Sequence, residues 1–362
     1  MSANWGKNIE LSLFGESHGK AIGIVIGNLP AGVTLDFDSI KKDLSRRAPG
    51  KNRMSTARKE KDEVEIISGI VDGVTTGAPL VGLIYNSDQH SQDYSYLKEL
   101  MRPGHSDYSA YEKYHGFNDV RGGGHFSGRL TAPIVFAGAI AKQILKEKGI
   151  YVGAHIQSIK DVYDDSFGVN ITEEILEKLL LKQYPTINDD AFIKMQETIE
   201  EARMSQNSVG GTIECAIINV PAGIGNPFFD SIEAHLSQLL FSIPAVKSVS
   251  FGLGEKITEL YGSEANDSYY YDGDKVKTKT NHNGGILGGI SNGMPIVFKV
   301  GIKPTASISL KQETVNVKTK ENATLEIRGR HDPCIVPRAI VVVEAMAALG
   351  ILDMVRNDER FK

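Results

Sequence analysis

The order of short motifs along this 362-residue chain occurs twice, and this repetition constrains the fold more than any other feature. The segment GNLPAGVTLDFDSIKKDLS at 27–45 is matched by INVPAGIGNPFFDSIEAHLS at 218–237, and GIVDGVTTGAPLV at 69–81 is matched by GILGGISNGMPIV at 285–297. Each half then ends in a Gly/Arg/His loop that leads into an apolar helix headed by an arginine. Matching motifs in one order indicate an internal duplication, whose period is far longer than that of a solenoid.

The repetition predicts the domain organisation and the fold class. We expect a single domain over residues 1–362, made of two pseudo-repeats at about 9–150 and 208–356. The helices expected to start at Thr131 and Pro337 are apolar nearly all round, so they should be buried between layers. The predicted fold is α+β: an internally duplicated β-α-β sandwich in which antiparallel sheets pack around central apolar helices.

The second repeat shows the expected local structure most clearly. The segment 212–220 has the apolar pattern of a strand. The Asp-Ser-Ile motif then predicts the start of a helix in each half, with Asp38 or Asp230 as its N-cap. Apolar residues follow at helical spacing: Ile232, Leu236, Leu239, Leu240 and Ile243.

Composition excludes several classes of protein. The net charge of −5 argues against a nucleic-acid-binding protein. The two longest apolar stretches carry Lys142 and Glu344, so we expect no membrane span. Cys215 and Cys334 are too few for a disulfide framework and fit no zinc pattern, which favours a reducing, cytoplasmic location.

Basic residues nevertheless concentrate between residues 41 and 61. This segment is either a solvated loop or part of a pocket for a small polyanion, because the arginine fork matches phosphate and carboxylate groups. Nucleic acid is disfavoured as its partner, since no aromatic residues are interleaved with the charges. Where the second repeat continues its helix with Gln238 and Leu239, the first has Arg46 and Arg47. We infer that the first repeat has become an anion-binding loop.

Two histidine motifs are candidates for acid–base chemistry. GESHG at 15–19 fits the G-x-S-x-G pattern of serine hydrolases, but only fourteen residues precede Gly15, too few to build the sheet that such a nucleophile needs. His18 within it could act as a general acid. His105, in RPGHSDY, follows a Pro-Gly turn and is either simply solvated or catalytic.

Two further motifs could bind an anion. KPTAS at 303–307 combines a lysine with hydroxyls at a strand end, which suits a phosphate ester or is an ordinary exit from a strand. GRHDPC at 329–334 adds Arg330 as an anion partner and Asp332 as a base. The signatures of P-loop nucleotide triphosphatases, HExxH zinc proteases and GxGxxG dehydrogenases are absent from the sequence.

Eight motifs of the chain together resemble those of chorismate synthases, in order and spacing, over about residues 6–355. They are GESHG, RRAPGKNR, SGIVDGVTTGAPLVGLIYNSDQHSQDY, MRPGHSDY, RGGGHFSGR, NHNGGILGGISNG, KPTAS and GRHDPC. The resemblance implies a lyase of the shikimate pathway, which supplies aromatic amino acid biosynthesis. In this reaction 5-enolpyruvylshikimate 3-phosphate loses phosphate and a ring hydrogen by anti-1,4-elimination and gives chorismate. It also implies a requirement for reduced FMN without net redox change, and a homotetramer of sheets around central helices. NADPH or an external flavin reductase would reduce the flavin, and the sequence does not decide between them.

The resemblance also implies roles for single residues. His18 would protonate the departing phosphate, His105 would lie at the flavin N1 edge, and Asp332 would relay the proton abstracted through flavin N5. The substrate would be held by Arg47, Arg53, Arg129 and Arg338, with Arg46, Arg102 and Arg121 as weaker candidates. FMN would contact His125, Phe126, Ser127, Pro244, Ala245, Gly288, Lys303, Pro304, Thr305, Ala306, Ser307 and Arg330.

The chain departs from the family pattern at one point. Many members have Arg-Ser-Ser after the triple glycine, whereas this chain has His125, Phe126 and Ser127. A cradle made by glycines and main-chain amides tolerates that exchange. The segment 160–205 carries little of the resemblance. A protein that binds a phosphorylated metabolite without chemistry is the alternative from another class, and it would not need His18 and Asp332.

Overall fold

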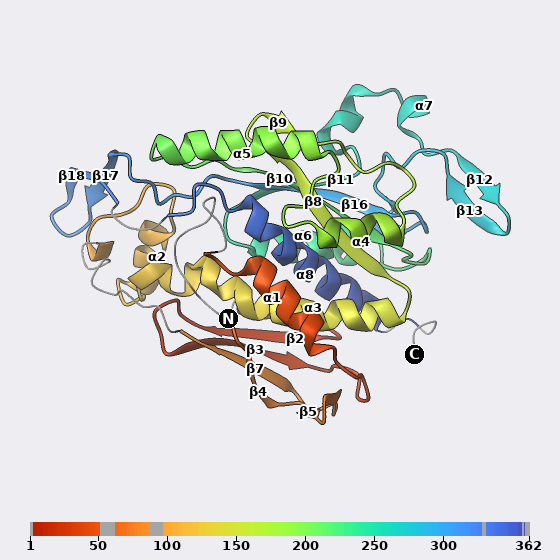
Figure 1. The fold of residues 1–362 in the computed structure, drawn as a ribbon, viewed down its shortest axis with the longest axis horizontal. Coiled ribbons are helices and arrows are strands. Elements are labelled where there is room, and N and C mark those ends of the chain that lie inside the picture. Colours follow the sequence, from red (N-terminus) through yellow and green to blue (C-terminus); the bar gives the residue numbers. More distant parts are fainter. Residues whose placement is uncertain (1–2, 51–61, 87–96, 328–330, 357, 359–362) are drawn as a thin grey trace.

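The structure is a computed structural model that describes residues 3–50, 62–86, 97–327, 331–356 and 358. Two five-stranded antiparallel sheets enclose a layer of helices (Figure 1). The first sheet has the order β1 (Asn4–Trp5), β2 (Glu10–Gly15), β3 (Ala21–Gly27), β7 (Leu80–Tyr85), β4 (Glu65–Ser68). The second has the order β11 (Val246–Phe251), β16 (Ile296–Ile302), β10 (Gly211–Ile218), β8 (Tyr151–Ile159), β9 (Val162–Tyr163). The predicted fold class, with sheets outside and helices inside, is therefore confirmed.

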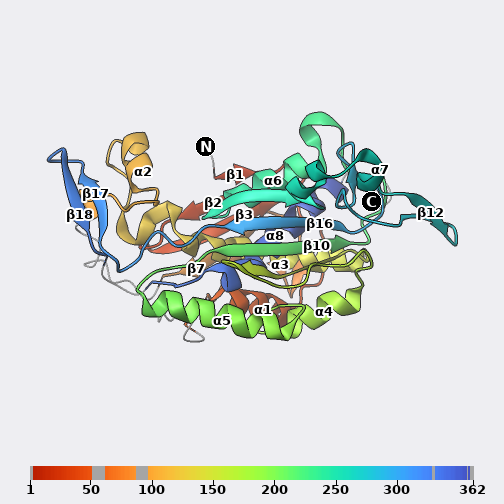
Figure 2. The ribbon, with the colours of Figure 1, turned by 90° about the horizontal axis from the view of Figure 1, so that it is seen from above.

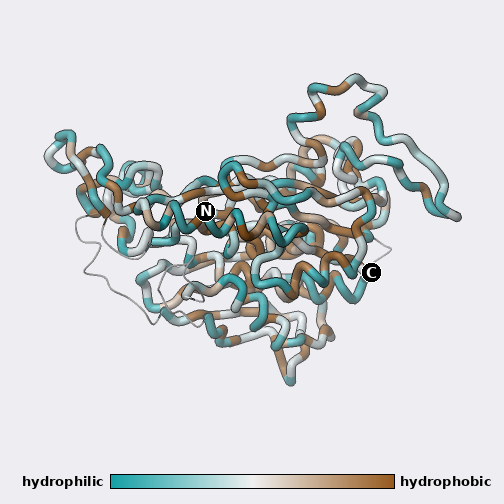
Figure 3. Tube along the Cα trace, turned by 45° about the horizontal axis from the view of Figure 1, so that its top comes forward, coloured by the Kyte–Doolittle hydropathy of each residue, from teal (hydrophilic) through white to brown (hydrophobic). Residues whose placement is uncertain are grey.

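Four helices lie between the sheets: α1 (Phe37–Arg47), α3 (Thr131–Glu147), α6 (Ile232–Ser242) and α8 (Val336–Val355). The helices expected at Thr131 and Pro337 are α3 and α8, which are buried along almost their whole length. Small residues let them approach closely, because a Cβ on Gly138 would lie 2.2 Å from the Cβ of Ala345. Figure 3 shows hydrophobic residues concentrated in this middle layer.

A charged cluster lies inside the helix layer and joins three of the helices. Glu344 of α8 is completely buried and accepts hydrogen bonds from Arg46 of α1 (2.6 and 2.8 Å) and from Lys142 of α3 (2.9 Å). Burial opposes ionisation of Glu344, but the two cations outweigh it and lower its pKa to about 2. Asp43 completes the cluster through contacts with both cations. Arg46 therefore serves to join helices.

The matching motifs of the two halves make matching hydrogen bonds. In the first half, Thr75 Oγ1 donates to Pro30 O (2.7 Å) and accepts from Val33 N (3.0 Å). In the second half, the equivalent Ser291 Oγ donates to Pro221 O (2.6 Å) and accepts from Ile224 N (2.9 Å). Each pair ties the Pro-Ala-Gly turn to a short hairpin: β5 (Ile70–Val71) with β6 (Val74–Thr75), and β14 (Ile286–Leu287) with β15 (Ile290–Ser291). These bonds support the proposal of two pseudo-repeats.

The prediction of Asp38 and Asp230 as helix N-caps is wrong. In α1 the cap is Asp36, whose carboxylate accepts from the backbone amides of Asp38 (3.0 Å) and Ser39 (3.1 Å). In α6 the cap is Ser231, whose Oγ accepts from Ala234 N (3.1 Å). An N-cap needs extended backbone and a side chain that reaches back to the first free amides, and these two residues meet both conditions.

The remaining elements lie around this sandwich. Helices α4 (Glu173–Leu181) and α5 (Asp189–Met204) cover the outer face of the second sheet (Figures 1 and 2). Leu176 of α4 packs on this face with Ala216 and Ile218, whereas Cys215 and Ile217 of the same strand face the central core. Helix α2 (Asp107–Tyr114) lies beside the hairpin β17 (Gln312–Asn316)–β18 (Glu321–Leu325), and the hairpin β12 (Tyr269–Asp272)–β13 (Lys275–Thr278) projects at the far end, next to the short helix α7 (Gly262–Ala265). Within the described residues, no helix is long and apolar enough to cross a membrane.

Candidate active site

The triple glycine forms a turn that passes between two of the predicted histidines. Gly122, Gly123 and Gly124 all have positive φ (57°, 84° and 53°), within the short 3₁₀ element η2 (Arg121–Phe126) that precedes α3. A Cβ on Gly122 would lie 2.3 Å from the His18 ring, and one on Gly123 would lie 3.4 Å from His105 Nε2. The sequence needs glycine here because any side chain would collide with one histidine or cover the other.

His18 is held in a turn at the end of β2. The amide of Ser17 donates to Gly124 O (3.1 Å), and Asn86 Nδ2, directly after β7, donates to the carbonyls of Glu16 (3.1 Å) and Gly19 (2.9 Å). His18 itself is 4% exposed. The chain then continues into the antiparallel strand β3, so Ser17 is not on the strand–turn–helix elbow of a serine hydrolase.

His105 is held by a carboxylate and an arginine from its own turn. Its Nδ1 lies 2.6 Å from Asp107 Oδ1. Arg102 binds the same carboxylate through Nε (2.7 Å) and Nη2 (2.8 Å), and its backbone amide lies 3.1 Å from Oδ2. Burial opposes ionisation of Asp107, but hydrogen bonds from Arg102 and His105 outweigh it and hold the pKa of the carboxyl well below its usual value. Asp107 is therefore a carboxylate that can only accept.

Two predicted substrate arginines meet on one buried carboxylate. Asp62 accepts from Arg47 Nε (2.8 Å) and Nη2 (2.6 Å) and, through its other oxygen, from Arg129 Nη1. All three side chains are at most 4% exposed. Arg129 also donates to Asn86 Oδ1 (3.2 Å), which connects this cluster to the turn of His18. Such shared, charge-assisted contacts fix both guanidinium planes.

The third arginine extends the cluster to the predicted base. Arg338, at the start of α8, donates to the backbone carbonyl of Arg47 (2.9 Å) and to Asp332 Oδ2 (2.7 Å). The carbonyl of Asp332 in turn accepts from Thr305 Oγ1 (2.9 Å). The structure thus brings Arg47, Arg129, Arg338 and Asp332 into one connected group.

The KPTAS segment leaves the end of β16 and links Asp332 to the turn of His105. Its lysine Nζ donates to Gly104 O, and Ser307 Oγ accepts from Arg102 Nη1 (3.3 Å). The backbone amide of Lys303 donates to Ala245 O (3.0 Å), which places the Pro244–Ala245 turn beside it. These contacts therefore join both histidines, three arginines, Asp332 and KPTAS around a single region of the molecule.

The segment after the glycines lies at the edge of this region. His125 is exposed and contacts Gly15 O through Nδ1 (2.8 Å); since a carbonyl only accepts, this nitrogen donates. Phe126 is 38% exposed, and its ring lies 6.3 Å from that of Tyr114. Ser127 Oγ accepts from Arg129 N (3.3 Å) and starts the short turn that places Arg129. Glycine backbone, an exposed aromatic ring and hydroxyls beside a lysine could hold a flat ring that carries a phosphate.

Some predicted residues are not brought into this group. Gly288 lies in the β14–β15 turn, where Gly289 O accepts from Ile232 N (3.0 Å) at the start of α6. Pro244 and Ala245 follow the other end of that 11-residue helix, about 16 Å away at 1.5 Å per residue. Arg121 pairs with Asp119 at the surface. Arg53 and Arg330 lie outside the described residues.

Two residues of the region, Asp62 and Asn86, were not among the predicted site residues. Asp62 directly follows the basic stretch 41–61, but Glu60, Glu63 and Glu65 lie beside it in the chain, so the sequence does not single it out. Asn86 directly follows β7 and had no role predicted for it, yet it connects Arg129 to the turn of His18. Contacts between side chains so distant in sequence do not follow from local spacing.

Comparisons with known proteins agree on one family. A family model described as chorismate synthase matches residues 9–355. The chain is 48% identical over 349 residues to chorismate synthase of Thermococcus gammatolerans, with 96% of each chain covered. It is 44% identical over 364 residues to that of Methanocaldococcus jannaschii, with 97% of this chain and 95% of the relative covered. A crystal structure of chorismate synthase superposes with a TM-score of 0.74 at 28% identity, covering 97% of this chain and 92% of that one.

Proposed function

The chain belongs to the chorismate synthase family, and on that premise we propose how its residues share the work of the reaction. The protein is a carbon–oxygen lyase that converts 5-enolpyruvylshikimate 3-phosphate into chorismate by anti-1,4-elimination of phosphate. One observation carries the assignment of roles: a single glycine turn contacts both His18 and His105, so the two histidines flank one place.

The arginine cluster binds the anionic substrate. The substrate carries a phosphate and two carboxylates, and Arg47, Arg129 and Arg338 present planar cations that are already oriented by Asp62 and Asp332. Arg53 belongs to the same proposal from its motif. Preorganised cations stabilise the charge that develops on a departing phosphate without reorganising during the reaction.

His18 is the general acid for the departing phosphate. It is buried, and the turn that carries it is bonded to the glycine turn and, through Asn86, to Arg129. A proton delivered at this point neutralises the leaving group where the cations already lie.

Asp332 accepts the proton that leaves the substrate ring. Its carboxylate is oriented by Arg338, which donates to Oδ2 at 2.7 Å. Its backbone carbonyl is fixed by Thr305.

The chemistry of the family requires reduced FMN, and the residues present fit such a group. When bound, the reduced flavin supplies an electron-rich ring beside the bond that breaks. Gly123 has no side chain of its own to place against the Nε2 edge of His105, where a Cβ would lie 3.4 Å away, and Phe126 offers an exposed ring. We propose that these residues hold the flavin ring and that the phosphate is held from the KPTAS segment, together with Ser127, Pro244, Ala245 and Arg330. The position of Gly288 argues that it takes no part beside Ala245 of the same chain.

Further properties follow from the family alone. We propose a cytoplasmic homotetramer whose flavin is reduced either by NADPH on the enzyme or by a separate reductase.

The test is an anaerobic assay of phosphate release and chorismate formation from 5-enolpyruvylshikimate 3-phosphate, with FMN either oxidised or chemically reduced. Equal amounts of phosphate and chorismate with reduced FMN alone are the expected result. Phosphate release with both forms would point to a phosphatase, and binding without any release would favour a protein that only binds a phosphorylated metabolite.

A further inference from the structure

The ring of His105 has two different surroundings. Nδ1 lies against Asp107 Oδ1 at 2.6 Å, whereas Nε2 lies beside the backbone of Gly123, where a Cβ would come within 3.4 Å of it. The side chain of His105 is 20% exposed, and that of Asp107 is 4% exposed. One ring nitrogen is therefore fixed inside the protein, and the other is directed toward the region that the proposed substrate and flavin would occupy.

The chemistry of the neighbours decides which nitrogen carries a proton. Arg102 Nη2 lies 3.1 Å from Nδ1, but a guanidinium can only donate and the Asp107 carboxylate can only accept. Nδ1 cannot satisfy both, and the shorter contact is to the carboxylate. Nδ1 therefore holds a proton and donates it to Asp107.

We propose that Asp107 and Arg102 are positioning residues for His105: Asp107 fixes the Nδ1–H tautomer, and Arg102 fixes Asp107. This inference rests on the function proposed above, in which His105 faces the flavin. With Nδ1 occupied, Nε2 alone exchanges protons or hydrogen bonds with a bound group. Fixing the tautomer through a carboxylate is a known requirement of histidines in catalysis.

The geometry gives Arg102 a different role from that of the substrate arginines. Its Nε and Nη2 both bind Asp107, its Nη1 reaches Ser307 Oγ at 3.3 Å, and the side chain is 5% exposed. Each of its three guanidinium nitrogens thus makes a contact within the protein. Arg102 should orient the site and should not contact substrate directly.

The first experiment reads the tautomer without the flavin. Enzyme labelled with ¹⁵N-histidine is studied by solid-state NMR, and the His105 signals are identified by their loss in His105→Gln among the nine histidines of the chain. We expect a protonated Nδ1 in the wild type. In Asp107→Asn the side chain has one acceptor oxygen, which can accept from Arg102 or from His105 but no longer fixes both. We therefore expect the signal of the Nε2–H form of His105 to appear.

The second experiment separates orientation from binding. We expect Asp107→Asn to lower kcat roughly 100-fold, the lower end of what a positioned proton-transfer group contributes, while KM for 5-enolpyruvylshikimate 3-phosphate changes little. Arg102→Lys keeps the charge but loses the two-point contact, and it should lower kcat with little change in KM. Asp164→Asn is the matched control, because it removes a carboxylate from His155, a buried histidine outside this region, and should leave kcat unchanged.

The outcomes distinguish this inference from the proposed function. Unchanged tautomer signals in Asp107→Asn, or a raised KM with normal kcat in Arg102→Lys, would overturn the positioning role and return Arg102 to the substrate arginines. A wild-type enzyme that forms no chorismate with reduced FMN would overturn the proposed function while the tautomer measurement still decides the role of Asp107.

Discussion

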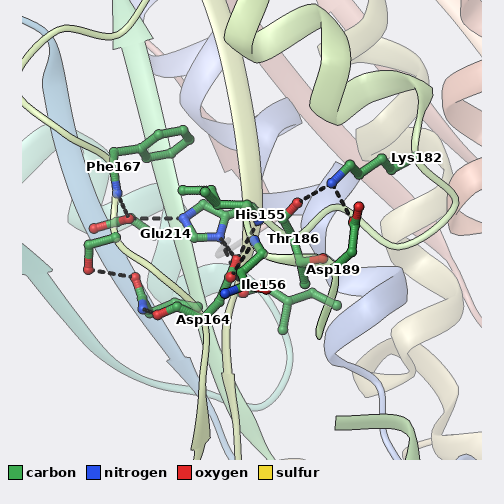
Figure 4. A network of polar contacts seen from close by, with 12 residues as sticks. His155, Ile156, Asp164, Phe167, Lys182, Thr186, Asp189 and Glu214 are labelled. Atoms are coloured by element: carbon green, nitrogen blue, oxygen red, sulfur yellow. Dashed lines mark hydrogen bonds and ion pairs between the residues drawn. The ribbon is translucent and has the colours of Figure 1, made fainter. Parts of the chain in front are cut away.

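Two histidines of this protein bind an aspartate through Nδ1, yet their surroundings differ at the other nitrogen. His105 has Gly123 backbone beside Nε2, whereas His155 has a second carboxylate there, Glu214 at 2.9 Å (Figure 4). The Nδ1 of His155 lies 2.9 Å from Asp164, and its side chain is completely buried. A histidine with one nitrogen fixed can still react at the other; a histidine with both fixed holds parts of the protein together.

The carboxylates around His155 are themselves held by the segment 164–188. Asp164 accepts from the amides of Ile187 (2.6 Å) and Asn188 (2.8 Å), and Glu214 accepts from that of Phe167 (2.7 Å). The ring of Phe167 contacts His155 edge-on at 4.7 Å. This network attaches the α4–α5 region to the outer face of the second sheet (Figure 4), which gives a structural role to part of the segment 160–205 that carries little of the family resemblance.

The largest expected effect is on turnover at His105. His105→Ala should lower kcat by about 10²- to 10⁴-fold, because it removes the group that faces the reacting region, while the urea midpoint stays near that of the wild type. His18→Ala should behave in the same way. The control is His115→Asn, which changes an exposed histidine at the end of α2 to a residue that tolerates its left-handed backbone (φ 54°). Near-normal turnover of both alanine variants would contradict the roles proposed for His18 and His105.

The sequence was most informative about features that depend on the order of residues along the chain. The repeat and the two all-apolar helices predicted the sandwich, since a helix without a polar face must be covered on all sides. Motif order also pointed to His18, His105 and Asp332, whose roles stay predictions. It could not show that Asp62 joins Arg47 to Arg129, because Asp62 lies before β4 and Arg129 lies in the turn before α3, 67 residues further along the chain. The prediction of the N-caps was wrong for a local reason. Asp36 and Asp38 carry the same side chain, and only backbone geometry distinguishes them.

The second-largest effect is expected at His155, where a substitution should lower stability and leave turnover unchanged, the opposite of the result at His105. His155→Ala leaves two carboxylates facing each other in a dry site, and breaking a buried ion pair in this way costs about 3–5 kcal/mol of the free energy of unfolding. Turnover of the fraction that remains folded should be unchanged. Urea titration at a fixed protein concentration tests the loss of stability, and kcat measured at urea concentrations below the unfolding transition tests the unchanged turnover. If His155→Ala impaired turnover as severely as His105→Ala, the distinction between the two histidines would fail.

A smaller effect is expected at the arginine cluster, and it separates substrate from flavin. Arg47→Ala should cost about 2–4 kcal/mol in kcat/KM for 5-enolpyruvylshikimate 3-phosphate, since one oriented cation is lost from the anion site. FMN affinity, measured by fluorescence titration, should change far less. Arg203→Ala, which breaks a surface pair with Glu200 on α5, is the control for simple loss of positive charge. Equal weakening of substrate and flavin would contradict the role of Arg47.

The smallest effect is the pH dependence of stability, and its sign follows from the charges around His155. Burial opposes protonation of His155, but the hydrogen bonds and charges of Asp164 and Glu214 outweigh it and raise the pKa above the ordinary value of 6.5. Lys299 lies 3.5 Å from Glu214, and its positive charge opposes protonation of His155. Because the folded state holds the proton more tightly than the unfolded state, the stabilisation is fully present below pH 6.5. It is lost as the pH rises through the folded pKa, by at most about 1.4 kcal/mol per pH unit. His155→Gln, which keeps one donor but does not titrate, should remove this part of the slope, and the control variant His115→Asn should not. A wild-type urea midpoint that stays constant or rises from pH 6.5 into the alkaline range, with the same profile in His155→Gln, would show that His155 is not held as a cation and would remove the electrostatic basis of the comparison with His105.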